Sequence, residues 1–333
     1  MEWCGTMKGL NKSSSWDLRN VLLNRIKEYG GFVNCHSHFD KAYLITPKLL
    51  PTGHLTLEQK WEFFRKIKKS YSKEDLKKRM SIAAEDMIEQ GISAVLTHID
   101  VDSSVKLMGI EAALDLKKKY KDKLKILIAT QALQGILDKK ERYWFERASE
   151  MVDVIGGLPS KDWPRYEEHI EMLLKIAKKN KKIVSVHIDQ ENNPNEKQSE
   201  LLAKKTIQIG MEGKVLGVHA VSLGAQEPKE IKRIAKLLVK AGVSIATCPG
   251  AAISMKMLPY SAPLHNAIAP LVALLEAKVN VCLGTDNIYD PFMPFADGDM
   301  WFETRVLMEA NRFYDLEKVA KVASINGKKA LHL

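Results

Sequence analysis

The apolar stretch at residues 31–38, GFVNCHSH, ends in two histidines spaced two residues apart, His36 and His38. Because alternate residues of a β-strand point to the same side, both imidazoles are expected on one face of a buried strand. Two imidazoles placed in this way can hold one metal ion. The same pattern also fits a core histidine with a chance neighbour, so its meaning depends on the rest of the chain.

Three later apolar segments also end in residues that bind metals, with His187 in VSVHIDQ, His219 in VHAVS and Asp286 in LGTDN. Imidazole and carboxylate ligands without a thiolate suit Zn²⁺ or Fe²⁺, and three histidines with one aspartate leave a position for water. A divalent ion lowers the pKa of that water to about 7. We therefore expect Asp286 to bind the ion and accept a proton, and His219 to orient the water or polarise the substrate.

The strands that carry these residues belong to a regular alternation of short apolar segments and amphipathic helices, which is typical of parallel βα units. Eight such units predict an α/β fold, a (β/α)8 barrel of the TIM type, in which the carboxyl ends of the strands meet at one mouth. A doubly wound open sheet is the alternative, but it normally has a glycine-rich turn after its first strand, and this sequence has none. After the first strand, the expected strands are residues 93–100, 124–131, 153–159, 182–189, 215–220, 243–249 and 279–286.

Amphipathic segments predict helices before the first strand and between the later ones. Residues 1–30 are expected to be a polar segment that ends in a helix at 17–29, and residues 31–333 to form one barrel domain. The other helices are expected at residues 56–70, 72–90, 103–121, 138–150, 165–180, 195–211, 228–241 and 263–277, and again after the last strand.

The composition, with 45% hydrophobic and 28% charged residues, is that of an ordinary globular protein. The N-terminus has no apolar core of signal-peptide length and no segment is long enough to span a membrane, so we expect a cytoplasmic protein without a membrane partner. The net charge of +10 raises nucleic-acid binding as a hypothesis. The lysine runs at 117–119 and 178–182 fall on exposed faces of amphipathic helices, however, and we expect no nucleic-acid partner. The four scattered cysteines predict neither a disulfide framework nor a cysteine zinc site.

These motifs resemble the amidohydrolase superfamily, and within it the cytosine-deaminase group of metal-dependent hydrolases, over residues 31–333. The resemblance implies one metal ion held by His36, His38, His187 and Asp286. It places His219 beside the activated water. Other branches of the superfamily bridge two metals with a carbamylated lysine on the fourth strand, and DVIGGLP has no lysine, so one Zn²⁺ or Fe²⁺ ion is the expected cofactor. The matching motifs are NCHSHFDKAY, VLTHIDVD, QGIL, DVIGGLP, VSVHIDQ, VHAVS, CLGTDNIYDPFMPFADGDM and SINGKKAL.

Two departures from the family pattern lie near the expected substrate. The third residue after the strand-five histidine is a proton-shuttling glutamate in the deaminases, and here it is Gln190, which cannot titrate. The shuttle must then be absent, be replaced by Asp189 or Glu191, or be unnecessary for this substrate. The family's pair of aspartates after strand eight is here Asp286-Asn287, which removes one carboxylate.

A third departure follows strand three, where the family's substrate-binding glutamine aligns with Leu133, between Gln131 and Gln134. Because the changes surround the substrate while the metal-binding set is complete, we expect a substrate other than cytosine. Gln190 is also a candidate catalytic residue. The residues expected to contact the substrate are Gln131, Gln134, Gln190 and Asn287.

Several other polar residues are assigned structural roles. His98 in THIDVD is expected to pack against or support the ligands, and Asp40 and Lys41 to form an ion pair at the rim of the site, although a substrate contact is the alternative for that pair. The histidines expected at the surface or at helix caps are His54, His169, His265 and His332.

Family members usually carry a small β-sandwich beside the barrel, and the short segment before His36 predicts a barrel without it. The surface exposed in this way favours a homo-oligomer. The leading hypothesis is a metal-dependent hydrolase that acts on a C–N bond, other than a peptide bond, of a small cyclic or amide substrate, by deamination or amide hydrolysis. The alternative is a catalytically degenerate metal-binding barrel that serves as a binding or scaffold protein, which Gln190 and Asn287 support and the complete set of metal-binding residues opposes.

Overall fold

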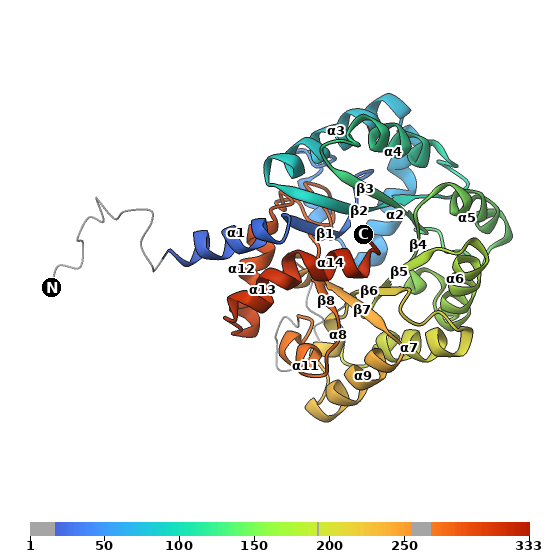
Figure 1. The fold of residues 1–333 in the computed structure, drawn as a ribbon. Coiled ribbons are helices and arrows are strands. Elements are labelled where there is room, and N and C mark those ends of the chain that lie inside the picture. Colours follow the sequence, from blue (N-terminus) through green and yellow to red (C-terminus); the bar gives the residue numbers. More distant parts are fainter. Residues whose placement is uncertain (1–16, 192, 255–267) are drawn as a thin grey trace, which may run out of the picture.

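The computed structural model describes residues 17–191, 193–254 and 268–333. The described strands form one parallel sheet in the order β1 to β8. The amides of Thr285 and Asp286, just after β8, donate to the carbonyl of His36 in β1 at 3.1 and 3.0 Å, which brings the last strand to the first and closes the barrel (Figure 1). The predicted (β/α)8 barrel is confirmed. The strands are β1 (Phe32–Ser37), β2 (Ile92–Asp100), β3 (Lys125–Gln131), β4 (Val154–Gly157), β5 (Ile183–Ile188), β6 (Val215–His219), β7 (Val243–Thr247) and β8 (Val281–Leu283).

Helices surround the strands, and Figure 1 shows them as an outer ring. Several begin at a residue whose side chain accepts from a free amide of the first turn. At the start of α2, Thr56 and Gln59 form a reciprocal capping box, and Ser72 and Asp138 cap α3 and α5. The helices are α1 (Leu18–Glu28), α2 (Leu57–Ile67), α3 (Lys73–Glu89), α4 (Met108–Lys119), α5 (Lys139–Met151), α6 (Tyr166–Asn180), α7 (Gln198–Ile209), α8 (Val221–Gly224), α9 (Pro228–Lys240), α10 (Pro249–Ser254), α11 (Leu271–Glu276), α12 (Met300–Asn311), α13 (Leu316–Ala323) and α14 (Ile325–Ala330), with short 3₁₀ helices η1 (Leu50–His54), η2 (Lys68–Ser70) and η3 (Pro159–Asp162).

The strands are buried on both faces, because one face packs on the helices and the other fills the barrel. Val184 and Val186 of β5 belong to the cluster that includes the helices. Cys35 of β1, Leu96 of β2 and Val218 of β6 belong to a separate cluster inside the barrel. This double burial explains why the strands appear in the sequence as nearly continuous apolar runs.

Helix α14 lies across one end of the barrel (Figure 1). It packs directly on β1 at Gly327, where a Cβ atom would lie only 2.7 Å from Cγ1 of Val33 and 2.8 Å from Sγ of Cys35. Only glycine fits at this contact. The helix therefore covers the end of the barrel where β1 begins, and the opposite end, where the strands finish, carries the polar side chains described below.

The observed elements differ from the predicted ones mainly in short segments. Helices α8 and α10 follow β6 and β7 where the alternation predicts none, because segments of four and six residues are too short to show a helical period. The predicted helix at 263–277 lies partly outside the described residues, and its described part is helical only over α11, after Pro270. None of the described helices combines the length and apolar character needed to cross a membrane.

One predicted surface residue is wrong. His169, in the first turn of α6, is buried, and its Nδ1 lies 2.6 Å from Oδ2 of Asp162. The helical pattern could not show that η3 folds against this turn. His54 and His332 are exposed as predicted, and His265 lies outside the described residues.

Candidate active site

A cavity opens at the carboxyl ends of the strands. His38, His187 and Asp286, three of the four residues predicted to bind a metal ion, line it, and much of the remaining lining is apolar. The position agrees with the general rule that barrel enzymes place their sites on this face. The residues that line it are His38, Lys41, Gly53, Leu55, Leu57, Lys60, Trp61, Gln131, Leu133, Leu158, His187, Gln190, His219, Ala251, Ser254, Asp286, Asn287, Phe292 and Met293.

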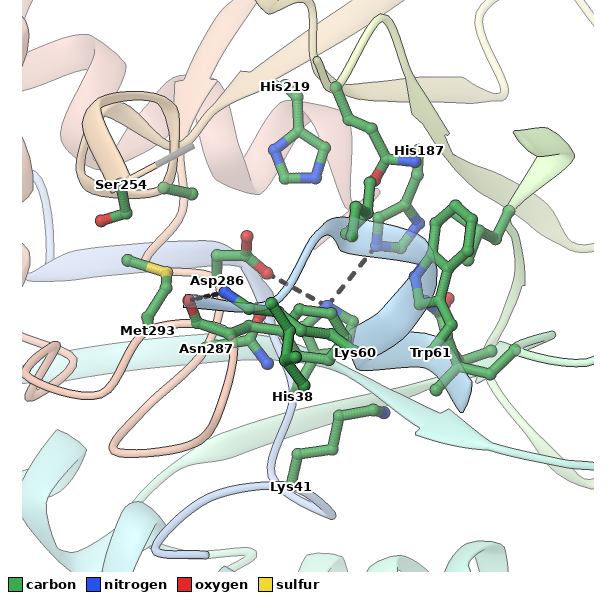
Figure 2. Close-up of a pocket in the computed structure, with 18 of the residues that line it drawn as sticks. His38, Lys41, Lys60, Trp61, His187, His219, Ser254, Asp286, Asn287 and Met293 are labelled. Carbon is green, nitrogen blue, oxygen red and sulfur yellow. Dashed lines mark hydrogen bonds and ion pairs between the residues drawn. The ribbon is translucent and has the colours of Figure 1, made fainter. Parts of the chain in front are cut away.

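His38 is the centre of the cluster of predicted ligands. Its Nε2 lies 3.2 Å from Nε2 of His36, 3.5 Å from Nε2 of His187 and 3.1 Å from Oδ1 of Asp286. Nε2 of His36 lies 3.3 Å from the same aspartate oxygen. Figure 2 shows His38, His187, His219 and Asp286 pointing toward one common space. The structure thus brings together all the residues predicted to hold the metal.

A β-bulge positions the two histidines of the first strand. Cys35 and His36 of β1 both lie opposite Leu96 of β2, so β1 has one extra residue at this point. A bulge re-aims the side chains beside it, and here it lets both Cys35 and His36 face the interior of the barrel. His38 follows just beyond the end of the strand. The pair therefore meets through a bulge and not through the simple alternation that the sequence suggests.

Backbone contacts position the other two predicted ligands, His187 and Asp286. The carbonyl of Gly157, at the end of β4, lies 3.0 Å from Nδ1 of His187, which leaves Nε2 of that ring directed into the cluster. Asp286 has a positive φ of 65° and is tied to β1 through its amide. The orientation of the His187 and Asp286 side chains thus depends on hydrogen bonds of main-chain groups, and a pattern of residue types does not reveal such bonds.

Burial sets the charges of the cluster. It lowers the pKa of His36 to about 3, and it lowers the pKa of His187 and His219 as well. Burial opposes ionisation of Asp286, but hydrogen bonds to His36 and His38 hold the pKa of that carboxyl well below its usual range. Neutral imidazoles and an ionised carboxylate are the forms that bind metals.

The ligand atoms fit a divalent metal ion. Ligands about 2.1 Å from a tetrahedral zinc ion lie about 3.4 Å from one another, and the separations around His38 are 3.1, 3.2 and 3.5 Å. Nδ1 of His36 and Nδ1 of His38 are buried without a hydrogen-bond partner among the described residues, so the polar contacts of these two rings are made by Nε2, the atom that lies in the cluster. Two sets of ligand atoms lie within 4.8 Å of one another, His36 with His38 and His187, and His36 with His219 and Asp286.

His219 and His98 both lie near these predicted ligands, but only His219 lines the cavity. The His219 ring is centred 5.4 Å from the His187 ring and lines the cavity, as expected of a residue that faces water or substrate. The His98 ring is centred 4.5 Å from the His36 ring, and its Nε2 lies 3.0 Å from Oγ of Ser185. His98 is not among the lining residues and supports the cluster from below, in line with the packing role predicted for it.

The predicted substrate contacts are only partly brought together. Gln131, Gln190 and Asn287 line the cavity, and so does Leu133. Gln134 is not among the lining residues, and its buried Nε2 has no hydrogen-bond partner in the described part of the chain. The tight turn after β3 directs Leu133 into the cavity in its place, so Gln134 is withdrawn as a substrate contact.

A buried ion-pair network supports the floor of the cavity. Nζ of Lys41 lies 3.2 Å from the Asp40 carboxylate and 2.9 Å from that of Asp100, and Nζ of Lys68 contacts Asp100 and Asp102. Burial opposes the charge of Lys41, but the two carboxylates outweigh it and raise the pKa of the amine. The predicted pair of Asp40 and Lys41 is confirmed, although both side chains are buried and not at the rim, and Lys41 also lines the cavity.

Replacing Lys68 with methionine is expected to lower the free energy of unfolding by about 3 kcal/mol, because it leaves Asp100 and Asp102 buried with too few cations. Chemical denaturation measures the change. The matched control is Lys77→Met, which removes an exposed pair with Asp115 at 3.1 Å and should cost less than about 1 kcal/mol. Equal losses of unfolding free energy in the two variants would show that the buried network stabilises the fold no more than an exposed ion pair does.

Several lining residues have no chemical signature in the sequence. Lys60 and Trp61 of α2 and Phe292 and Met293 after β8 also line the cavity. The capping box at Thr56 predicts where α2 begins, but nothing in its pattern shows that the helix lies beside the mouth. These residues therefore became visible only from the fold.

Comparison with known proteins gives a matching family and a matching fold. Residues 30–333 match the amidohydrolase family. An uncharacterized protein of Haemophilus influenzae is 35% identical over 263 residues, which cover 78% of this chain and 95% of that protein. N-isopropylammelide isopropyl amidohydrolase of Pseudomonas sp. (strain ADP) is 28% identical over 312 residues, which cover 90% of this chain and 74% of the relative.

Solved structures extend the comparison to three dimensions. The crystal structure of 5-methylcytosine deaminase from Klebsiella pneumoniae, liganded with 5-fluorocytosine, superposes with a TM-score of 0.84 at 25% identity. The match covers 91% of this chain and 74% of that one. The sequence thus relates the chain to a protein named as an amidohydrolase, and the structure relates it to one named as a deaminase.

Proposed function

The chain belongs to the amidohydrolase family of metal-dependent C–N hydrolases, and we propose that it removes an amino or alkylamino group from a small flat ring. The observation that carries the proposal is the convergence of metal-binding side chains on the floor of a cavity whose walls are apolar and partly aromatic. Relatives named for 5-methylcytosine and for N-isopropylammelide support a ring substrate. The residues 31–333 are proposed as the catalytic unit.

One Zn²⁺ or Fe²⁺ ion is proposed for the site, held by His36, His38, His187 and Asp286. Such an ion supplies a water of lowered pKa and therefore a nucleophile at neutral pH. A second ion is not proposed, because the segment of β4, residues 154–157, contains no lysine that could be carbamylated to bridge two metals.

Asp286 is proposed as the proton acceptor and His219 as the group that positions the attacked carbon. The Asp286 carboxylate is ionised and lies at the edge of the cavity, where it can take the proton of the attacking water. The pKa of His219 is lowered by burial, so its neutral ring can donate one hydrogen bond to the substrate. The leaving amine then departs toward the open side of the cavity.

Gln190 is proposed to orient the ring without exchanging a proton. Its Nε2 donates to Oγ of Ser160 at 3.3 Å, and its side chain lines the cavity. A side-chain amide cannot act as an acid or a base near neutral pH. A ring that needs a carboxylate to protonate its nitrogen, as cytosine does in the deaminases of this group, should therefore be a poor substrate.

Replacing Gln190 with glutamate is expected to raise the rate of ammonia release from cytosine by at least about tenfold, because a positioned general acid contributes about 10²–10⁴ in rate. Steady-state assays of ammonia release from cytosine measure the change. Gln190→Leu, which has a similar size and no polar group, is the control and should not gain activity. A glutamate variant no faster on cytosine than the wild type would show that this position does not control proton transfer.

The catalytically degenerate scaffold is not favoured. The side chains proposed as ligands converge, the pKa of the carboxylate proposed to accept the proton is held well below its usual range, and the relatives are named as a deaminase and an amidohydrolase. Gln190 and Asn287 change the substrate side of the cavity and leave the metal side complete.

The proposed function is tested by incubating the metal-loaded protein with a panel of aminopyrimidines, amino- and alkylaminotriazines, aminopterins and open-chain amides, and measuring released ammonia and alkylamine separately. Turnover of at least one ring amine is expected. Turnover of open-chain amides alone would overturn the proposal in favour of amide hydrolysis, and a fully metal-loaded protein inactive on every compound would revive the scaffold alternative.

A further inference from the structure

Lys60 is a cation in the cavity wall that lacks an ion-pair partner among the described residues. Its side chain belongs to α2 and is only 9% exposed. Its Nζ donates to the carbonyl of Phe292 at 3.3 Å, and no described carboxylate lies within 4.0 Å of it. Lys41, the other lysine that lines the cavity, has two carboxylates in contact. The positive charge of Lys41 is therefore already paired within the protein, whereas that of Lys60 is available to pair with a ligand.

The charge of Lys60 is not balanced at longer range either. Burial lowers the pKa of the Lys60 amine, and Asp290 is the one carboxylate that acts in the opposite direction. Asp290 is itself buried, its pKa is raised to about 7, and its oxygens accept from Asn287 and from the amides of Phe292 and Met293. Asp286, the acidic residue that does line the cavity, contacts His36 and His38. An anion placed against Lys60 would relieve a cost that these neighbours leave in place.

Gln131 offers a second group for a ligand in the same cavity. Its side chain is 3% exposed, and its Oε1 has no hydrogen-bond partner among the described residues. A buried amide oxygen without a partner costs free energy, which a ligand N–H would recover. Lys60 and Gln131 thus call for opposite partners, an oxygen acceptor at the lysine and an N–H donor at the glutamine.

Other residues that line the same cavity suit a flat molecule. Trp61 and Leu133 line the cavity, and Phe292 is held in place by stacking on Phe64, with ring centroids 4.8 Å apart and planes 3° apart. Aromatic and apolar faces of this kind bind a planar ring by contact area alone. The charge of Lys60 and the hydrogen bond to Gln131 would then distinguish one flat ring from another.

Resting on the proposed function, we propose that the substrate is a flat heterocycle in its anionic form, with an oxygen attached to the ring bound by Lys60 and a ring N–H donated to Gln131. The product, in which an oxygen replaces the amine, keeps the same features. Neutral aminopyrimidines of the same size satisfy Gln131 and leave Lys60 without a counter-ion. The specificity of this chain would therefore be for charge as well as for shape.

Direct binding of two product-like rings to the metal-loaded protein tests this inference. Barbiturate is a planar six-membered ring that is anionic at neutral pH, and uracil is a planar ring of similar size that is neutral. Calorimetry on the wild type is expected to show barbiturate binding at least about tenfold more tightly than uracil, since hydrogen bonds to charged groups are worth about 1.5–3 kcal/mol. Lys60→Met should remove this preference and leave uracil binding unchanged.

Three further variants control the result. Lys60→Arg keeps the charge and should keep the preference for barbiturate. Lys66→Met removes an exposed lysine from the same helix, with 69% of its side chain exposed, and should change neither affinity. Gln131→Leu should weaken both rings about equally, since both carry ring N–H groups, and thermal unfolding confirms that each variant is folded.

Equal affinity of the wild type for the two rings, or undiminished barbiturate binding in Lys60→Met, would overturn the anionic substrate. Neither outcome touches the proposed function, which depends on release of amine or ammonia from the ring panel. A wild type that hydrolyses neutral ring amines and ignores barbiturate keeps the function and loses this inference. If the metal-loaded wild type is inactive on the whole panel, the proposed function is overturned, whatever its affinities for barbiturate and uracil.

Discussion

Replacing His38 with alanine is expected to leave the purified protein without bound metal and without measurable C–N hydrolysis. Nε2 of His38 contacts all three other proposed ligands, at 3.1 to 3.5 Å, so its loss opens the ligand set at its centre. The affinity for metal should fall by more than the roughly 10- to 100-fold that loss of an outer-shell partner costs. Metal content after gel filtration and competition with a chelator measure the change.

The control for this variant is a histidine of the same buried cluster that is not proposed as a ligand. His98→Asn removes a ring centred 4.5 Å from that of His36 and keeps a side chain able to bond to Ser185. It should retain close to one equivalent of metal. Normal metal content in His38→Ala, or equal loss in the two variants, would contradict the ligand assignment.

Replacing Asp286 with asparagine is expected to lower kcat by about a thousandfold, even at metal concentrations that saturate the site. The amide has nearly the shape of the carboxylate but cannot accept the proton of the attacking water, and proton transfer by a positioned group contributes about 10²–10⁴ in rate. The neutral amide would also be a weaker ligand than the ionised carboxylate, so the metal dependence should shift to higher concentration.

Asp297→Asn is the matched control, because Asp297 is an exposed aspartate in the same loop after β8. Its kcat should stay close to that of the wild type. If Asp286→Asn keeps more than about a tenth of the wild-type kcat when fully loaded with metal, another group must accept the proton.

The barrel could be predicted because its strands are buried on both faces and its helices on one. Because of this burial, each strand appears in the sequence as a short apolar run. His187, His219 and Asp286 stand at or just after the ends of such runs, and the barrel fold brings these ends together. The convergence of the residues proposed as metal ligands could be predicted for the same reason. Ligands at the carboxyl ends of parallel strands converge whatever the details of the loops.

The substrate side could not be predicted to the same degree, because it is built by loops and by a helix whose placement has no periodic signal. Lys60 and Trp61 occur in an amphipathic helix that differs little from the others, and only its position beside the mouth gives them a role. The turn after β3 selects Leu133 over Gln134, which an alignment of residue types does not show. The bulge at His36 is a third such case. Simple alternation predicts that His36 and His38 lie together, but it does not predict the bulge that turns His36 toward the interior of the barrel.

The most direct test of the central claim, that one metal ion in this cluster activates water for C–N hydrolysis, is a metal titration of the chelated protein against its activity on a ring amine. Zn²⁺ or Fe²⁺ is added in steps to the metal-free wild type, and released amine or ammonia is measured at each step. Activity should be absent at the start and rise linearly to a plateau at one equivalent of metal per chain. Full activity in the metal-free protein, or a plateau at two equivalents, would contradict it.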